Sequence, residues 1–202
     1  MTAGTTPGRV VNTYDGSGNL VEEARYNADG SLSGKDIYIL TYDSKGNLSE
    51  KVHIDADGTP STREVTLYDT EGNRLEEDTY HSDGTLWSKN LYDGSGHHIE
   101  DSDYSDEKVS RRDVHIYDSS GNLIEETHDV GVQPLWSRSV YTYDGNGNQT
   151  LKITYDREGI RDKYVYTNDS EGNWVKQAHS RRSWTNSLEP VEDQYRVIEY
   201  YK

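Results

Sequence analysis

The chain has 202 residues, of which 31% are hydrophobic and 29% charged, and its formal net charge is −16. A balance this acidic disfavours nucleic-acid binding, which relies on clustered Lys and Arg, and no apolar stretch approaches the roughly 20 residues of a membrane span. The absence of cysteine excludes disulfides and thiolate metal sites.

Residues 1–9 form a polar leader that has neither the basic nor the apolar region of a signal peptide. From there a heptapeptide of the form Tyr-Asp-x-x-Gly-x-x dominates the chain. Its copies start at residues 14, 42, 68, 92, 117, 143 and 168. A weaker copy lies roughly midway between them, starting at residues 26, 54, 80 and 155. A period of this length indicates a repeat architecture.

The chemistry of the heptapeptide predicts a hairpin turn. Asp43 and Gly46 suit positions i and i+3 of a type I turn, and the glycine can adopt the positive φ that closes it through a bulge. In that register Tyr42 lies opposite Leu48, and such cross-strand pairs stabilise a sheet. The same rule assigns turn or clamp roles to Tyr14, Asp15, Gly18, Leu20, Asp43, Gly46, Leu48, Asp118, Gly121 and Leu123.

Consecutive hairpins of one type predict an all-β fold, an antiparallel meander of about 14 strands. Neither face of the strands is plainly apolar, so we expect a single-layer sheet, or one that curls or spirals. Tandem hairpins cover residues 10–180, and residues 181–202 read as a capping hairpin. Two segments depart from the pattern: residues 104–108 lack the turn glycine, and residues 127–135 read as a longer loop.

Strand alternation places the clamp tyrosines on one face together with a row of glutamates. Counting from the turns puts Glu22 opposite Asp36 and Glu50 opposite Glu64, which are like-charge pairs. Two interpretations follow: a solvated face with basic neighbours, or an acidic, tyrosine-lined strip that binds cations, sugars or a basic partner. The candidate binding residues are Tyr42, Glu22, Asp36, Glu50, Glu64, Glu76 and Trp136, the last beside the irregular 127–135 segment.

Catalytic and metal chemistry find little support in the pattern. The turns look like calcium loops but lack a carboxylate placed as in an EF-hand. The seven histidines are scattered, and His98 meets His115 only if the 104–108 turn allows it. Paired carboxylates recur in every repeat, whereas a glycosidase needs a single pair with separated pKa values. We therefore expect no catalytic residue, metal or cofactor, with a glycoside-active enzyme as a remote alternative.

The pattern Y-D-x-x-G-x-L after an aromatic-rich strand, as in residues 37–48 and 113–126, resembles the YD repeat of RHS-type proteins over about residues 10–180. The resemblance implies spiralling β-sheets in bacterial surface or secreted proteins that bind ligands or carbohydrates. This chain departs from the family at Asn19, Asn47 and Asn73, where a basic residue often follows the turn glycine.

These observations predict a non-catalytic β-sheet scaffold or binding surface, extracellular or at the cell surface. The alternative is a carbohydrate- or cation-binding module that uses the tyrosine and glutamate face. The expected partners are a glycan, another protein or a second copy of the chain, joined through the face or an edge of the sheet.

Overall fold

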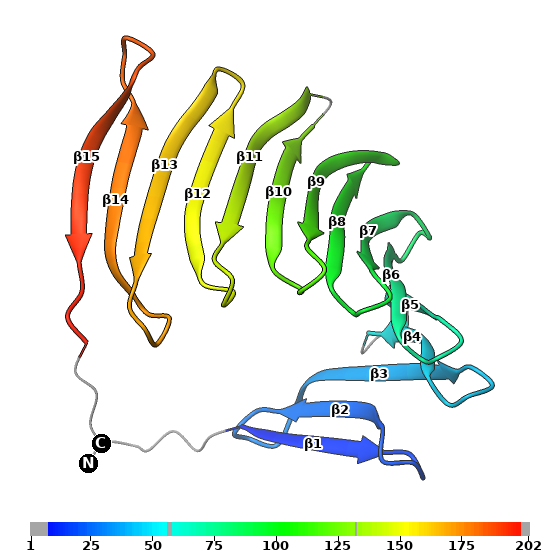
Figure 1. The fold of residues 1–202 in the computed structure, drawn as a ribbon. Coiled ribbons are helices and arrows are strands. Elements are labelled where there is room, and N and C mark those ends of the chain that lie inside the picture. Colours follow the sequence, from blue (N-terminus) through cyan, green and yellow to red (C-terminus); the bar gives the residue numbers. More distant parts are fainter. Residues whose placement is uncertain (1–7, 56–57, 132, 199–202) are drawn as a thin grey trace, which may run out of the picture. The chain divides into compact units, whose positions relative to one another are not determined.

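The computed structural model describes residues 8–55, 58–131 and 133–198, which form antiparallel β-strands whose order in the sheet is the chain order (Figure 1). The fold class is thus the predicted all-β meander, with fifteen strands in the described residues against about 14 expected. None of the described residues is helical, so they contain no helix that could cross a membrane.

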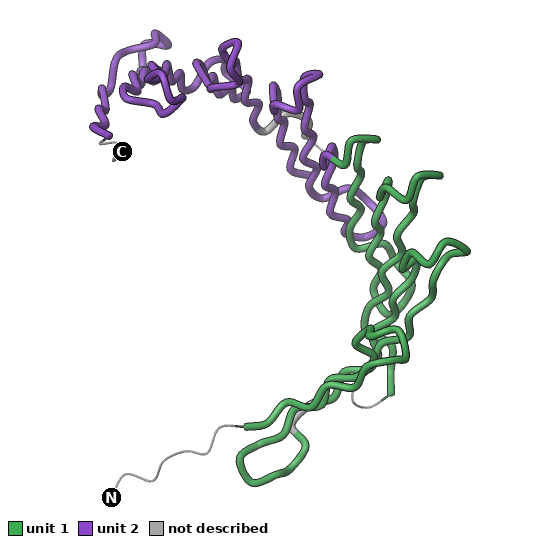
Figure 2. The backbone as a smooth tube through the Cα atoms, turned by 60° about the horizontal axis from the view of Figure 1, so that its bottom comes forward, with its two compact units in different colours: residues 1–96 green, residues 97–202 purple. Residues whose placement is uncertain are grey.

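Two compact units divide the chain, residues 1–96 and 97–202 (Figure 2). The first holds β1 (Arg9–Tyr14), β2 (Leu20–Tyr26), β3 (Leu32–Tyr42), β4 (Leu48–Ile54), β5 (Pro60–Tyr68), β6 (Arg74–His81) and β7 (Leu86–Tyr92). The second holds β8 (His98–Ser105), β9 (Lys108–Tyr117), β10 (Leu123–Val130), β11 (Gln133–Tyr143), β12 (Gln149–Asp156), β13 (Gly159–Asn168), β14 (Trp174–Arg182) and β15 (Leu188–Tyr195).

Each unit is a single layer. Within a unit, described strands contact their neighbours in the sheet, and the one further contact joins β13 and β15. Among the described residues Ala24 is the only buried hydrophobic side chain, with 4% of its surface exposed. Without an apolar core, the units depend on ladder hydrogen bonds and cross-strand side-chain pairs.

The turn after β3 has the predicted chemistry. Gly46 has a φ of 87° and donates its N–H to the Asp43 carbonyl oxygen at 3.1 Å. The Asp43 carboxylate accepts the backbone N–H groups of Lys45 and Asn47, each at 2.8 Å, and the Asn47 side-chain amide at 2.9 Å. Asn47 stands where the RHS pattern often has a basic residue, and its two hydrogen bonds hold the Asp43 carboxylate in place.

The clamp pairs are found where the turn geometry puts them: Tyr14 opposite Leu20, Tyr42 opposite Leu48 and Tyr117 opposite Leu123. A second irregularity follows each of them. Thr41, the neighbour of Tyr42, lies opposite Glu50, so one residue of β4 is left over. This extra β-bulge recurs at the clamps of the other YD hairpins with a described register, and it moves every later residue of the return strand to the other face.

The clamp tyrosines also join successive YD hairpins. The ladder between β4 and β5 ends at Glu50 and Val65, two residues short of Leu48. The Tyr68 hydroxyl donates a hydrogen bond to the Leu48 carbonyl oxygen beyond that end, at 3.0 Å. In the second unit the same place is filled by bonds from Tyr117 to His98 (3.2 Å), Tyr143 to Leu123 (2.7 Å) and the Asn168 amide to Gln149 (3.1 Å).

Two segments without the usual turn differ from expectation. Asp106 and Glu107 both have positive φ, 51° and 60°, and connect β8 to β9 as a two-residue hairpin, which needs no glycine. The longer loop predicted at 127–135 is wrong: β10 runs to Val130, and its partner Gln133 already belongs to β11. The hydrophobic and β-branched residues there extend the strands instead.

Residues 181–202, where a hairpin was expected, contain the end of β14 and the whole of β15, which pairs with β14 across residues 183–187. The strand β15 is exposed along its whole length. Residues 1–7 of the leader and residues 199–202 lie outside the described part of the chain.

Candidate functional site on the tyrosine face

Because of the extra bulge, the clamp tyrosines and the glutamates two residues after the clamps lie on opposite faces of the sheet, whereas the sequence had placed them on one face. Tyr42 and Thr41 are strand neighbours and point to opposite faces, and Glu50 lies opposite Thr41. Glu50 therefore shares no face with the clamp, contrary to prediction. We call the side of Tyr14, Tyr42 and Tyr68 in the first unit, and of Tyr117 and Tyr143 in the second, the tyrosine face.

The predicted like-charge pairs are also shifted by one residue. Glu22 lies opposite Ile37, and Asp36 opposite Glu23. Glu50 lies opposite Val65. The expected register was wrong because it counted one bulge per turn where the chain has two.

Glu64 lies opposite Lys51 and forms an ion pair with it at 3.4 Å, on the tyrosine face. The register with one bulge per turn placed Glu50 opposite Glu64. The second bulge puts the positive charge of Lys51 there instead.

On the face opposite the tyrosines, each glutamate after a clamp pairs with a basic residue of the next strand. The pairs are Glu22 with Lys35 (3.0 Å), Glu50 with Arg63 (2.5 Å), Glu76 with Lys89, Glu100 with Arg112 (2.5 Å) and Glu125 with Arg138 (2.6 Å). These glutamates have basic neighbours, as the first of the two interpretations expected, but they lie on the face opposite the tyrosines and not beside them. Trp136 belongs to β11, but its side chain lies outside the described part of the chain.

The tyrosine face carries a recurring pair that sequence reasoning missed: an aspartate in contact with a histidine of the next strand. In the described part of the chain there are three such pairs: Asp36 with His53 (3.1 Å), Asp113 with His128, and Asp162 with His179 (2.8 Å). In each, an arginine also contacts the aspartate: Arg25 (2.9 Å), Arg111 and Arg181 (2.9 Å), respectively. The signal was present, since each aspartate precedes its clamp position by four or six residues and so shares its face.

The Asp162 cluster is the most enclosed of the three. Only 5% of Asp162 is exposed, and the ring of Tyr164 stacks on His179 with centroids 4.3 Å apart. Burial by itself would raise the pKa of Asp162, but hydrogen bonds from Arg181, His179 and Arg161 outweigh it and lower the pKa to about 2. The carboxylate is a fixed, saturated acceptor.

The Asp113 cluster borders a hollow of about 210 Å³. His115, Glu126 and Ser137 line it together with Asp113 and His128. The Nδ1 atom of His115 is buried and has no hydrogen-bond partner among the described residues. The rings of His98 and His115 lie 5.8 Å apart, so these two histidines do meet.

The Asp36 cluster has an additional carboxylate. Asp55, at the start of the turn after β4, approaches the Nδ1 atom of His53 to 3.9 Å, and the Ser61 hydroxyl lies 2.6 Å from the same nitrogen. Tyr38 stacks on His53 with centroids 5.4 Å apart. Asp36, His53 and Asp55 form the one group among the described residues whose His and carboxylate atoms could together hold a metal ion.

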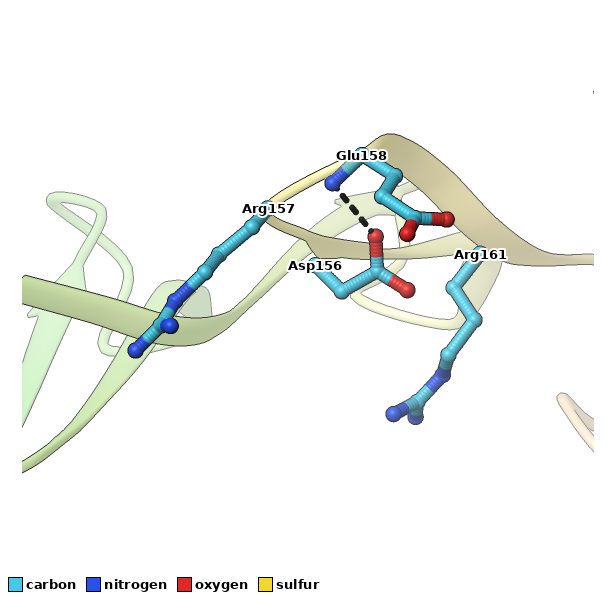
Figure 3. A pocket seen from close by; sticks show the side chains of 4 residues that line it. All are labelled: Asp156, Arg157, Glu158 and Arg161. Atoms are coloured by element: carbon cyan, nitrogen blue, oxygen red, sulfur yellow. Dashed lines mark hydrogen bonds between the residues drawn. The ribbon is translucent and has the colours of Figure 1, made fainter.

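A further hollow, of about 300 Å³, lies at the turn between β12 and β13 (Figure 3). The carboxylates of Asp156 and Glu158 lie between the side chains of Arg157 and Arg161, and the Glu158 N–H donates to Asp156 at 2.8 Å. Both carboxylates also contact Arg182. The charges of this hollow are compensated within the chain.

A groove of about 680 Å³ follows the turn edge of the second unit. Two successive YD turns line it with Asp118, Ser120, Asn122, Asp144 and Asn146. Tyr141 and Tyr143 also border the groove. Its lining is rich in hydroxyl, amide and carboxylate groups.

Comparisons with known proteins add little to this geometry. No family model matches the chain, and no curated protein matches it. Among solved structures, a chain in the crystal structure of TcdB2-TccC3-Cdc42 is 14% identical over 90% of this chain and 14% of its own length, with a TM-score of 0.42. A porin-like protein from Bacteroides uniformis is 12% identical over 96% of this chain and 91% of its own, with a TM-score of 0.36. At these distances the likenesses carry no argument about function.

The site can hold charge and donate hydrogen bonds, and one cluster has the groups of an acyl-transfer triad. Ser61 lies 2.6 Å from Nδ1 of His53 and Asp36 lies 3.1 Å from Nε2, so the two ring nitrogens are exchanged relative to the serine-protease arrangement, in which the carboxylate holds Nδ1. The Ser61 hydroxyl also lies 3.5 Å from the His53 carbonyl oxygen, an acceptor on the same strand pair.

Proposed function

We propose that the chain is a non-catalytic β-sheet repeat scaffold of a bacterial surface or secreted protein. The observation that carries the proposal is the repeated bond from a clamp side chain to the carbonyl oxygen of the preceding YD hairpin. It gives each hairpin the same attachment to its neighbour, as a repeat scaffold requires. The resemblance of the heptapeptide to the YD repeat of RHS-type proteins supports the cellular context.

The ionic groups support the same proposal, because they recur instead of converging. The glutamates two residues after the clamps, on the face opposite the tyrosines, are each paired with a Lys or Arg, and the Asp–His pair occurs three times among the described residues. A catalytic carboxylate pair is singular, and its two members have separated pKa values.

Turnover assays test the non-catalytic role. The full chain is incubated with nitrophenyl glycosides and nitrophenyl esters, and we expect no product above that of a heat-denatured sample. Product formation that disappears in Glu125→Gln or Ser61→Ala, with the fold intact by circular dichroism, would overturn the proposal.

A second function, binding of a polyhydroxylated ligand such as a glycan, is favoured by the turn-edge groove of the second unit. Its hydroxyl, amide and carboxylate lining matches the donors and acceptors of a sugar, and Tyr141 and Tyr143 border it. Glycan-array binding by the wild type is expected to weaken in Ser120→Ala/Asn146→Ala. The matched control is Ser17→Ala, the same turn position in the first unit. No binding, or equal loss in the control, would remove this function.

A further inference from the structure

We propose that Asp36, His53 and Asp55 bind a divalent transition-metal ion of the Zn²⁺ type. The inference does not depend on the scaffold role. It concerns one place in the first unit, where β3, β4 and the following turn bring together one imidazole and two carboxylates. The ligand atoms, one from each residue, lie within 4.8 Å of one another.

Distances within the group suit a shared ion. The Nε2 atom of His53 lies 3.1 Å from an Asp36 oxygen. An ion about 2.1 Å from each of two atoms at that separation would see them at about 95°, so the two atoms have to move apart by about 0.3 Å to reach the tetrahedral angle of Zn²⁺. Asp55 lies 3.9 Å from Nδ1, the other ring nitrogen, and its half-exposed side chain (51%) has to turn toward Nε2 to reach the ion.

The second observation is an unpartnered ring nitrogen. The Nε2 atom of His53 is buried and makes no hydrogen bond within the described part of the chain, although the Asp36 oxygen is near. On the other side of the ring, Nδ1 contacts the Ser61 hydroxyl at 2.6 Å. When Nδ1 carries the ring proton, the lone pair of Nε2 has no donor among the described residues, and an ion bound by Nε2 and the Asp36 oxygen would fill that place.

Neighbouring groups leave this position usable. Arg25 holds the other oxygen of Asp36 at 2.9 Å, so it fixes the carboxylate without occupying the oxygen that faces His53. Tyr38 stacks on the imidazole and holds the ring plane. Contacts of this kind orient ligands around metal sites. The formal net charge of −16 further favours a cation.

The donor set selects the ion. An imidazole nitrogen with two carboxylate oxygens suits Zn²⁺ and similar ions, whereas Ca²⁺ and Mg²⁺ favour oxygen ligands alone. The other Asp–His pairs provide internal controls, because Asp113–His128 and Asp162–His179 share the pair and its arginine but belong to no three-ligand group among the described residues.

Calorimetric titration of the full chain with ZnCl₂ at pH 7.5 tests the proposal. The wild type should bind one equivalent, and His53→Ala and Asp55→Asn should each lose more than about tenfold in affinity. Asp55→Asn retains a side chain suited to starting the turn, so it separates ligand loss from misfolding. His128→Ala should bind as the wild type does.

Three results would overturn the proposal: no zinc binding by the wild type, undiminished binding by both ligand variants, or equal loss in His128→Ala. A second readout is the nitrogen NMR shift of His53. Zinc should move the Nε2 signal in the wild type and in Ser61→Ala. A shift that occurs equally on acidification and not with zinc would assign the site to a proton shared with Asp36.

Discussion

Tyr143 acts twice in the hairpin that it closes. Its ring lies opposite Gln149 across the turn, and its hydroxyl donates to the Leu123 carbonyl oxygen of the preceding YD hairpin at 2.7 Å. The ladder between β10 and β11 ends at Glu125 and Val140, two residues before that carbonyl. The hydroxyl group of Tyr143 therefore joins two successive YD hairpins.

Replacing Tyr143 by Phe should lower the free energy of unfolding by about 1–2 kcal/mol, because the partly buried carbonyl loses its donor while the ring remains. Urea denaturation followed by circular dichroism measures the change. Tyr195→Phe is the control, since this tyrosine is 70% exposed and should change stability by less than about 0.5 kcal/mol. Equal effects in the two variants would remove the coupling role from the hydroxyl.

Asp162 makes stability depend on acid pH. Its pKa is about 2 in the folded chain against 3.8 ordinarily, so the folded state favours the ionised form. The stabilisation, about 2 kcal/mol, is fully present above pH 4 and is lost as the pH falls through 2. Unfolding free energies measured from pH 5 to 2 should show a steeper decline for the wild type than for Asp162→Asn. Parallel curves would contradict this assignment.

At the scale of the hairpin, Gly46 and Asp43 determine the turn. Gly46 has a φ of 87° with nothing within 4 Å of a Cβ placed there, so Gly46→Ala would suffer only the backbone strain. We expect a loss of about 1–2 kcal/mol. Gly16→Ala, in another YD turn and also uncrowded but without a positive φ, should be neutral or slightly stabilising. Thermal unfolding of the two variants measures the difference, and equal melting temperatures would reject the strain.

Within the hairpin, the sequence predicted the turn and the clamp pair but not the second bulge. The pairing of Tyr42 with Leu48 follows from turn chemistry, because the turn type sets which residues face each other. The second bulge does not follow, since no residue type marks it: the extra position is Ser49 after Leu48 and Ile124 after Leu123. One undetected residue reversed the face assigned to every glutamate after it.

In each of the two units, strands contact mainly their neighbours in the sheet. Strands at the ends of a repeat array have a single partner, and β1 and β15 are exposed at every position, whereas β4 is half-buried throughout. Hydrogen exchange followed by mass spectrometry should show β1 exchanging faster than β4 in the first unit, and β15 faster than β13 in the second. Uniform protection within a unit would indicate that it opens only as a whole.

The sequence by itself determined the meander, its turns and its clamps, because Asp, Gly and the paired Tyr and Leu act over seven consecutive residues. Only the tertiary structure decided which side chains share a face, because that depends on a bulge with no residue signature. It also decided which distant groups meet. The Asp36, His53 and Asp55 cluster depends on two strands whose register the turns alone do not set, and so the residues of the proposed metal site became visible only in the folded chain.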